Sequence, residues 1–297
     1  MQRFVIILAL LFVLSPWARA ESIALILSDD SPPFKEFAAR FQETLKGSDW
    51  RINYQGTALQ NKPLIKFDLI ITAGGEALRS VIDSKPKAPV LAALITEANF
   101  RTLHGNTRSP PEITAIVLDQ PASRQARLIH LLFPQAKQVG MLFGPQTISQ
   151  SETFRKALSR HQLQLNVDSV SNQEQIVPAI DHLISRSDVL LAHPDTAIYS
   201  RNTIKPILMT AYRHRRPVVA FSSALAKAGA VAALYSTPGQ IGEQTGKYLL
   251  SRKKSDTLVL LPTSFSISIN QSVAESFGLR LPDENDLLQK LFTAESS

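Results

Sequence analysis

The sequence predicts an α/β protein with two Rossmann-like lobes, each built on a parallel sheet, joined by a multi-strand hinge. Short apolar runs alternate with stretches of helical periodicity, which is typical of a parallel sheet covered by helices on both faces. This alternation stops near residues 119–121 and then begins again. The length of 297 residues also suits one large domain or two ordinary ones.

In the first half, apolar runs predict strands, and apolar residues three or four positions apart predict helices. Phe34, Phe37, Phe41 and Leu45 show this helical spacing, and a second helix is predicted over residues 76–82. The predicted strands are residues 23–27, 51–54, 67–72, 89–95 and 113–118.

The second half repeats the pattern, and a tail follows it. The predicted strands are 138–143, 164–170, 188–192, 217–221 and 231–235, and the predicted helices are 123–133, 151–161, 173–185 and 203–213. The tail predicts helices at 239–252 and 271–277 and strands at 257–260 and 265–269. Because the first part of the tail returns to the first lobe, we expect one lobe of residues 21–118 plus 237–262. The other lobe is then residues 119–236 plus 263–297.

Residues 1–20 have the layout of a secretory signal peptide. Arg3 supplies a basic start, residues 4–14 are an unbroken apolar run, and Ala18-Arg19-Ala20 fits a cleavage site. A spanning helix needs about twenty apolar residues, which is longer than this run. We expect cleavage after Ala20, leaving 277 residues free in the periplasm. The chain has no cysteine, which excludes a lipid anchor at the cleavage site, disulfides and thiolate chemistry.

The charge of the chain is basic but scattered. Residues 1–20 carry two Arg and no acid, so their removal lowers the net charge from +7 to +5. The densest basic clusters, residues 213–216 and 252–254, lie where predicted helices end, and cations are favoured there. Nucleic-acid binding would need a basic stripe interleaved with aromatic residues, so we expect no nucleic-acid partner.

Motifs for catalysis, metals or cofactors are missing from the sequence. There is no G-x-S-x-G elbow and no His-Glu-x-x-His motif, and the six histidines lack metal-ligand spacing. Only His193 falls at the end of a predicted strand. Residues 242–248 resemble a phosphate-binding loop, but the motif is one residue short, lacks the Ser or Thr after Lys247 and lies inside a helical pattern. We therefore expect a protein that is not an enzyme and has no cofactor and no metal.

Polar side chains gather at the ends of the predicted strands. Ligands of open α/β sheets bind at the carboxyl ends of strands, and two such lobes can close on a ligand by bending at a hinge. Hydroxyls and backbone N–H groups there could hold a carboxylate, Asp195 could pair with an amine, and an aromatic ring could cover the side chain. The candidate ligand-binding residues are Ser28, Asp29, Thr72, Ala73, Gly74, Thr96, Glu97, Asp195, Thr196, Phe221, Ser222 and Tyr235.

Each of these candidates has an ordinary structural alternative. Ser, Thr and Asp are the preferred N-caps of helices, so each such side chain could serve as a cap rather than as a ligand contact. Gly74-Gly75 follows a strand and opens a helix, which suits a seat for a carboxylate or small anion, but a plain tight turn has the same glycines.

Four segments resemble a family of ABC-transporter substrate-binding proteins with the type I periplasmic-binding fold, relatives of aromatic amino-acid receptors. These segments are residues 137–145 (KQVGMLFGP), residues 217–222 with 228–235 (PVVAFS and AGAVAALY), residues 241–246 (IGEQTG) and residues 269–282, which contain Asn270, Ala274, Gly278 and Pro282. The likeness spans nearly the whole chain after residue 20.

The resemblance implies a monomeric receptor that closes two lobes on a small polar or zwitterionic, amino-acid-like molecule for an inner-membrane ABC permease. By the same resemblance, Thr72, Ala73, Asp195, Phe221 and Ser222 fall in ligand loops. Two loops depart from the family: Thr96-Glu97-Ala98 replaces an Asp-Pro pair, and residues 28–33 replace a turn that contains His-Pro.

Two alternatives remain open at this point. One is a ligand sensor or accessory subunit of a membrane partner, without a dedicated permease, which the altered loops favour. The other is an exported enzyme, which would need a convergent nucleophile, base and orienting group that the sequence does not offer.

Overall fold

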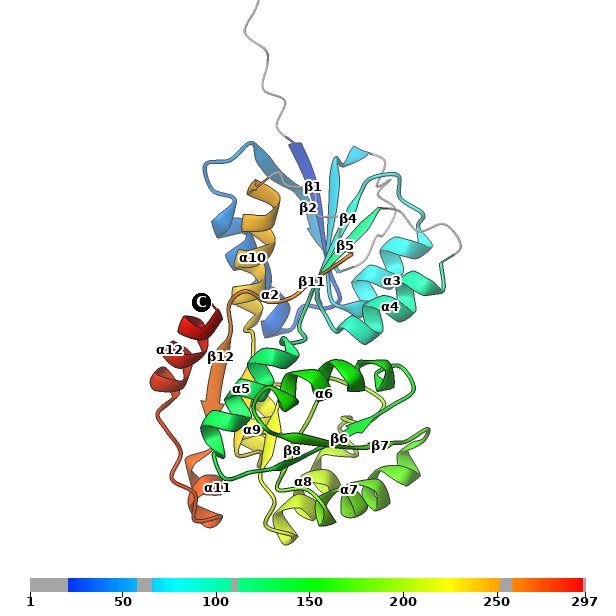
Figure 1. Cartoon of the computed structure of the whole chain (residues 1–297). Helices are drawn as coiled ribbons and strands as arrows, with labels where there is room; N and C mark the ends of the chain where they lie inside the picture. Colours follow the sequence, from blue (N-terminus) through cyan, green and yellow to red (C-terminus); the bar gives the residue numbers. More distant parts are fainter. Residues whose placement is uncertain (1–20, 58–65, 108–111, 252–257, 296–297) are drawn as a thin grey trace, which may run out of the picture.

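The computed structural model describes residues 21–57, 66–107, 112–251 and 258–295. These residues form two six-stranded sheets, each flanked by helices on both faces, in two lobes that lie one above the other in Figure 1. The predicted α/β class with two lobes is confirmed. The predicted signal peptide, residues 1–20, lies outside the described residues. Among the residues described, no helix combines the length and the apolar character that crossing a membrane requires.

The first sheet has the strand order β11-β5-β4-β3-β1-β2, and its neighbouring strands all run parallel. Helices α2 and α10 cover one face, and α3 and α4 cover the other (Figure 1). The strands are β1 (Glu21–Leu27), β2 (Trp50–Gly56), β3 (Leu69–Ala73), β4 (Val90–Ile95), β5 (Ile113–Val117) and β11 (Val259–Leu260). The helices are α2 (Pro32–Thr44), α3 (Gly75–Asp83), α4 (Glu97–Gly105) and α10 (Pro238–Leu250).

Strand β1 shows why the inner strands of this sheet are largely apolar runs in the sequence. Ile23 and Leu25 pack on one face with Phe37 of α2, and Ile26 packs on the other face with Leu78 of α3. A parallel strand that is buried on both faces reads as an unbroken apolar run rather than as an alternation.

The second sheet has the order β12-β10-β9-β8-β6-β7, and it is parallel except for β12, which runs antiparallel to β10. Its strands are β6 (Gln138–Phe143), β7 (Gln164–Ser169), β8 (Val189–Leu191), β9 (Val218–Ala220), β10 (Ala232–Tyr235) and β12 (Ser266–Ile269). One face packs against α5 (Ala122–Leu132), α6 (Ser151–Ser159) and α12 (Glu284–Glu295), and the other against α7 (Ile176–Ser185), α8 (Ile204–Arg213) and α9 (Ser223–Ala228). Three short helices complete the fold: η2 (Ile148–Gln150), η3 (Gln173–Gln175) and α11 (Gln271–Ser276).

Helix α10 follows strand β10 of the second sheet in the chain but packs on the first lobe, against α2. A Cβ atom added to Gly242 would lie 2.5 Å from the carbonyl oxygen of Phe37, so only glycine permits this close approach. The faint phosphate-loop pattern of residues 242–248 is therefore part of a helix–helix contact.

Three segments of the chain pass between the sheets, at residues 118–121, 236–237 and 261–265. Gln120 Nε2 donates a hydrogen bond of 2.9 Å to Ser236 Oγ, and Ser236 Oγ donates one of 2.6 Å to the carbonyl oxygen of Ser264. We call these three residues the hinge network, because they tie the crossing segments together where two lobes would bend. The lobe boundaries at 118, 236 and 262 stay a prediction.

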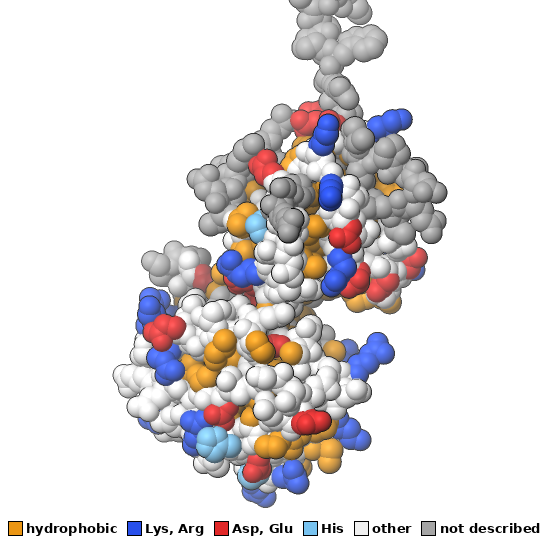
Figure 2. Space-filling view, turned by 90° about the vertical axis from the view of Figure 1, so that its right-hand side faces the viewer, with side chains coloured by type: hydrophobic (Ala, Val, Ile, Leu, Met, Phe, Trp, Pro, Cys, Tyr) orange, Lys and Arg blue, Asp and Glu red, His pale blue; other side chains and the backbone are white. Residues whose placement is uncertain are grey.

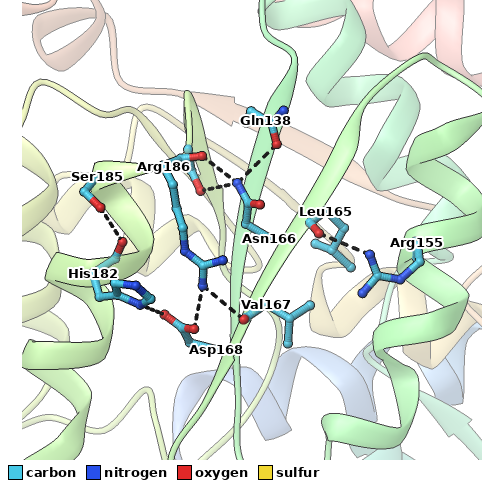
Figure 3. Close-up of polar contacts among 10 residues, drawn as sticks. Gln138, Arg155, Leu165, Asn166, Val167, Asp168, His182, Ser185 and Arg186 are labelled. Carbon is cyan, nitrogen blue, oxygen red and sulfur yellow. Dashed lines mark hydrogen bonds and ion pairs between the residues drawn. The ribbon is translucent and has the colours of Figure 1, made fainter.

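Strand β7 is the outer edge of the second sheet and carries polar side chains (Figure 3). Asp168 accepts a hydrogen bond of 2.5 Å from Arg186 and lies 2.9 Å from the ring of His182. Asn166 donates to Gln138 on the neighbouring strand β6 at 3.2 Å. Charged side chains on an edge strand discourage pairing with another chain.

Three α-helices were missing from the sequence prediction: α4, α9 and α12. Helices α4 and α9 are short and begin directly after strands β4 and β9, so they leave little room for a periodic signal. Thr96 and Ser222, predicted as ligand residues, are the N-caps of α4 and α9.

Candidate ligand-binding site

A cavity of about 500 Å³ lies between the two lobes. The carboxyl ends of strands from both sheets form its walls, which is where α/β sheets bind ligands. Figure 2 shows the two lobes as separate masses with a waist between them. The lining residues are Pro33, Phe34, Glu36, Leu94, Thr96, Leu118, Pro194, Phe221, Ser222, Ser223, Tyr235, Ser236, Thr237 and Pro238. Another cavity, of about 370 Å³, opens at the amino ends of the first sheet and contacts one lobe only.

The amino ends of four helices meet at this interlobe cavity. Pro33 and Phe34 lie in the first turn of α2, and Thr96, Ser222 and Thr237 are the N-caps of α4, α9 and α10. A helix N-terminus carries a partial positive charge and favours a negative group nearby. Among the described residues, no Lys or Arg lines the cavity, and one carboxylate, that of Glu36, accepts from the N–H of Gly239 in the first turn of α10 at 2.9 Å.

Three hydroxyls of the cavity act as helix caps. Thr96 Oγ1 accepts from the N–H of Asn99 at 3.3 Å, Ser222 Oγ accepts from Leu225 at 3.3 Å, and Thr237 Oγ1 accepts from Gln240 at 3.1 Å. Each hydroxyl keeps its own proton for donation. Thr96 and Ser222 can therefore each cap a helix and donate a hydrogen bond to a ligand at the same time.

Apolar side chains from both lobes form the rest of the wall. Phe34 comes from the first lobe, and Phe221 and Tyr235 come from the second. Sequence reasoning missed Leu94, which has a φ of +51° at an irregularity in the pairing of β4 with β5. A positive φ is strained for leucine, and such strain is typically held where a side chain must be aimed.

The predicted residues of the first lobe largely serve the turn after β3. Ser28 Oγ donates to the carbonyl oxygen of Ala73 and accepts from the N–H of Ala77 in the first turn of α3, both at 3.0 Å. Gly74 has a φ of +92°, and a Cβ atom there would lie 2.4 Å from Ser28 Oγ. The glycine pair thus provides a tight turn with close packing. The backbone N–H of Ala77, which an anion at this helix end would need, already donates to Ser28.

The remaining predicted residues lie away from the interlobe cavity. Thr72 and Ala73 are fully buried in β3, and Thr196 is exposed. Asp29 is exposed and accepts from the N–H of Ser31 at 2.7 Å. Of the twelve predicted residues, the structure brings Thr96, Phe221, Ser222 and Tyr235 together at the interlobe cavity.

Asp195 is buried within the second lobe and has a complete set of partners. Its carboxylate accepts from the N–H of Gly144 at 3.0 Å, from Thr147 Oγ1 at 2.6 Å and from the N–H of Ala197 at 2.8 Å. These contacts join the loops after β6 and β8. Since its oxygens are engaged, an amine of a ligand would have to compete with three donors.

A smaller cavity, of about 270 Å³, lies next to the interlobe cavity, and we call it the second cavity. Each of three consecutive pairs, Thr96 with Glu97, Leu118 with Asp119 and His193 with Pro194, places one member on each cavity. The lining residues of the second cavity are Glu97, Asp119, Gln120, Pro121, Ala122, Gln150, Thr153, Phe154, His193 and Leu261. Glu97, one of the predicted residues, lies here, and its carboxylate accepts from Arg101 at 2.7 Å.

Asp119 and His193 are the buried titratable groups of this second cavity. Asp119 Oδ2 accepts from the N–H of Glu97 at 2.7 Å, and Asp119 Oδ1 lies 3.6 Å from His193 Nε2. Burial raises the pKa of Asp119 to about 7 and lowers the pKa of His193 to about 4. No group of three or more His, Asp or Glu side chains in the described ranges is arranged to hold a metal ion.

The two lobes and the cavity between them define a binding protein of the type I periplasmic-binding fold. A similar structure is a domain in complex with L-Trp from Streptococcus pneumonia, with a TM-score of 0.61, 20% identity and coverage of 90% of this chain and 98% of that chain. A conserved domain protein from Vibrio cholerae has a TM-score of 0.61 at 19% identity, covering 91% and 98% of the two chains. A ligand-free, open substrate-binding protein with adhesive properties from Clostridium difficile has a TM-score of 0.66 at 16% identity, covering 89% and 96%.

Residues 54–290 match the family of ABC transporter substrate binding proteins, and the chain belongs to this family. The resemblance found in the sequence is thereby confirmed. No curated protein matches the sequence significantly.

Proposed function

We propose that this protein is a periplasmic receptor that closes its two lobes on a small amino-acid-like molecule and presents it to an inner-membrane ABC permease. The observation that carries the proposal is the cavity of about 500 Å³ lined by strand ends of both lobes. A ligand there would touch both lobes at once, so its binding would favour the closed arrangement.

The lining of the interlobe cavity supports a ligand with an apolar body and a carboxylate. Phe34, Phe221 and Tyr235 offer three aromatic rings from two lobes, and the helix N-termini favour the negative group. A similar domain was crystallised with L-Trp, which has both features. We infer binding without catalysis, because three hydroxyls of the cavity serve as helix caps and none of the described histidines lines the cavity to activate a hydroxyl as a nucleophile.

Calorimetric titration of the purified exported protein tests this proposal. We expect L-Trp, L-Phe or L-Leu to bind with micromolar affinity, and L-arabinose, which needs many polar partners, not to bind. Phe221→Ala should weaken binding about tenfold or more by removing one aromatic wall. Met209→Ala, at an exposed site on α8, is the matched control and should bind like the wild type. Equal affinity of both variants for every ligand would contradict the assignment of the cavity.

Transport needs a separate test, because the alternative of a sensor or accessory subunit also binds a ligand. Deletion of the gene should abolish uptake of the radiolabelled ligand, and N-terminal sequencing of the exported protein should read from Glu21. Normal uptake in the deletion strain would favour the sensor.

A further inference from the structure

We propose that the cavity between Asp119 and His193 is the subsite for a protonated amine of the bound molecule. This inference rests on the proposed function, and it names the chemical group that the second cavity recognises.

The first observation is that polar atoms lining this cavity are buried without partners. Asp119 is 3% exposed and His193 is 2% exposed. Among the described residues, Asp119 Oδ1 and both ring nitrogens of His193 have no hydrogen-bond partner. Buried polar groups in native proteins are nearly always paired, so three such atoms on two residues that line one cavity indicate a missing partner. A neutral imidazole carries a proton on one ring nitrogen, so an ammonium group would satisfy Asp119 Oδ1 and the other ring nitrogen.

The second observation is that the two residues do not satisfy each other. Their closest polar atoms, His193 Nε2 and Asp119 Oδ1, are 3.6 Å apart, which is longer than a hydrogen bond. Asp119 follows β5 of the first sheet, and His193 follows β8 of the second. A ligand group between them would therefore join the two sheets, as closure of the lobes requires.

The third observation is the charge around this cavity. Three groups with negative or acceptor character face it: Asp119, Glu97 and the neutral imidazole of His193. Two cations contact residues of this cavity: Arg101 pairs with Glu97 from the exposed side, and the buried Arg124 donates to Gln120 at 2.6 Å and pairs with Glu295. Asp195, the other charge that acts on His193, is also an acid. An anion would be repelled here, whereas an ammonium group has three donors and no acceptor to leave unpaired.

Protonation fits the same assignment. Burial holds the pKa of His193 at about 4, so at pH 7 its ring is neutral and has a nitrogen that accepts a hydrogen bond. Burial also raises the pKa of Asp119 to about 7, so about half of the carboxyls carry a proton at that pH. An ammonium group would stabilise the carboxylate, and binding at pH 7 should therefore release a proton from Asp119.

The interlobe cavity would then hold the rest of the molecule. The two cavities flank the same strand ends, because Thr96, Leu118 and Pro194 line one cavity and their chain neighbours Glu97, Asp119 and His193 line the other. Asp195, the amine partner expected from the sequence, already accepts three hydrogen bonds. Asp119 is the carboxylate with an oxygen to spare.

The test compares two ligands that differ only in the charged end, 2-phenylethylamine and 3-phenylpropionate, titrated at pH 7 into the full exported protein. We expect the amine to bind at least tenfold more tightly. Asp119→Asn should remove most of that preference while changing the affinity for 3-phenylpropionate less than threefold. Asp181→Asn, an acid-to-amide change at an exposed site on α7, is the matched control and should keep the preference.

Proton release gives a readout that a merely structural role of Asp119 would not move. Titrations of the amine in two buffers of different ionisation enthalpy should show release of about half a proton at pH 7 for the wild type and none for Asp119→Asn. His193→Gln should weaken amine binding and keep the proton release.

The possible outcomes separate this inference from the proposed function. Equal binding of the two ligands, or an unchanged preference in Asp119→Asn, overturns the amine subsite and leaves the receptor proposal standing. An imidazole of His193 that stays protonated at pH 7 also overturns it, because the pair would then be an ion pair between lobes. Absence of binding by every aromatic amino acid, amine and acid at millimolar concentration overturns both.

Discussion

Asp195 and Asp119 are both buried carboxylates that follow a strand, yet their surroundings differ. Asp195 accepts three hydrogen bonds from donors in its own lobe. Asp119 accepts one, from the N–H of Glu97, and its other oxygen is buried 3.6 Å from an unpartnered histidine nitrogen. A buried charge is tolerated when its partners are complete and is costly when they are not. Asp195 therefore holds the loops after β6 and β8 together, whereas Asp119 has an oxygen that could still accept from a ligand.

This contrast predicts opposite effects of mutation. Replacement of Asp195, which has three donors, should destabilise the fold. Replacement of Asp119, which has one donor, should stabilise the fold at neutral or higher pH. The predictions below test the contrast in order of decreasing effect.

Asp195→Ala should have the largest effect. The change leaves the N–H of Gly144, the hydroxyl of Thr147 and the N–H of Ala197 without their acceptor, and we expect a loss of about 4 kcal/mol in the free energy of unfolding. Urea denaturation at pH 7 measures this loss. Thr196→Ala, at the exposed neighbouring position, should stay within about 0.5 kcal/mol of the wild type. Equal stability of the two variants would break the comparison.

Asp119→Asn should increase stability at pH 8. The pKa of Asp119 is about 7 in the folded protein against 3.8 as its ordinary value, so the folded state binds the proton more tightly. Its carboxylate therefore lowers stability progressively as the pH rises from about 4 through 7. The amide has no such cost, and we expect it to be more stable by about 2 kcal/mol at pH 8, a difference that shrinks as the pH falls.

Urea denaturation of both proteins up to pH 8 provides the measurement. Because His193 lies 3.6 Å from Asp119, the titrations of the two groups are coupled, and the comparison is made at pH values well above 4, where the imidazole is neutral in both proteins. A difference that does not grow with pH would show that Asp119 is ionised without cost and has partners that we have not assigned.

Asp168→Ala extends the comparison to a carboxylate at the edge of a sheet (Figure 3). Asp168 has two side-chain partners, Arg186 and the ring of His182, but Arg186 is 37% exposed and His182 is 67% exposed. Solvent screens such pairs, and we expect a loss of about 1 kcal/mol. Thermal unfolding at low and at 0.5 M salt should show the loss shrinking with salt.

Arg40→Gln should have the smallest effect. Arg40 pairs with Glu243 between α2 and α10, but Arg40 is 53% exposed and Glu243 keeps a second partner in Lys247. We expect a change of less than about 0.5 kcal/mol in urea denaturation. A loss above 1 kcal/mol would contradict this expectation, because it would show that an exposed ion pair also stabilises the fold of this protein.

Much of the fold could be predicted from periodicity, because strands buried on both faces leave unbroken apolar runs. The strand 138–143 was predicted to the residue, and the hinge crossings near 119–121 and 236–237 follow from the restart of the pattern and the return of the tail. Helices α4 and α9 were missed because six to nine residues after a strand cannot show two helical turns of clear periodicity.

The candidate site was harder to predict, because its partners are distant in sequence. Strand ends and the family resemblance led to Thr96, Phe221, Ser222 and Tyr235, all of which line the interlobe cavity. The donors that occupy Asp195 come mainly from Gly144 and Thr147, some fifty residues away, and no local pattern signals them. His193 was noted as the one histidine at a strand end, but its neighbour Asp119 could not be paired with it without coordinates.

The three crossings between the sheets also govern the order in which the chain can assemble. Strand β11 completes the first sheet, and helix α10 covers it, yet both are synthesised after β10 of the second sheet. A nascent chain that ends at residue 235 thus has most of the second sheet and an unfinished first lobe. Such long-range closure slows folding. For a chain exported as we propose, late completion of the first lobe would help to keep it unfolded until nearly all of it has crossed the membrane.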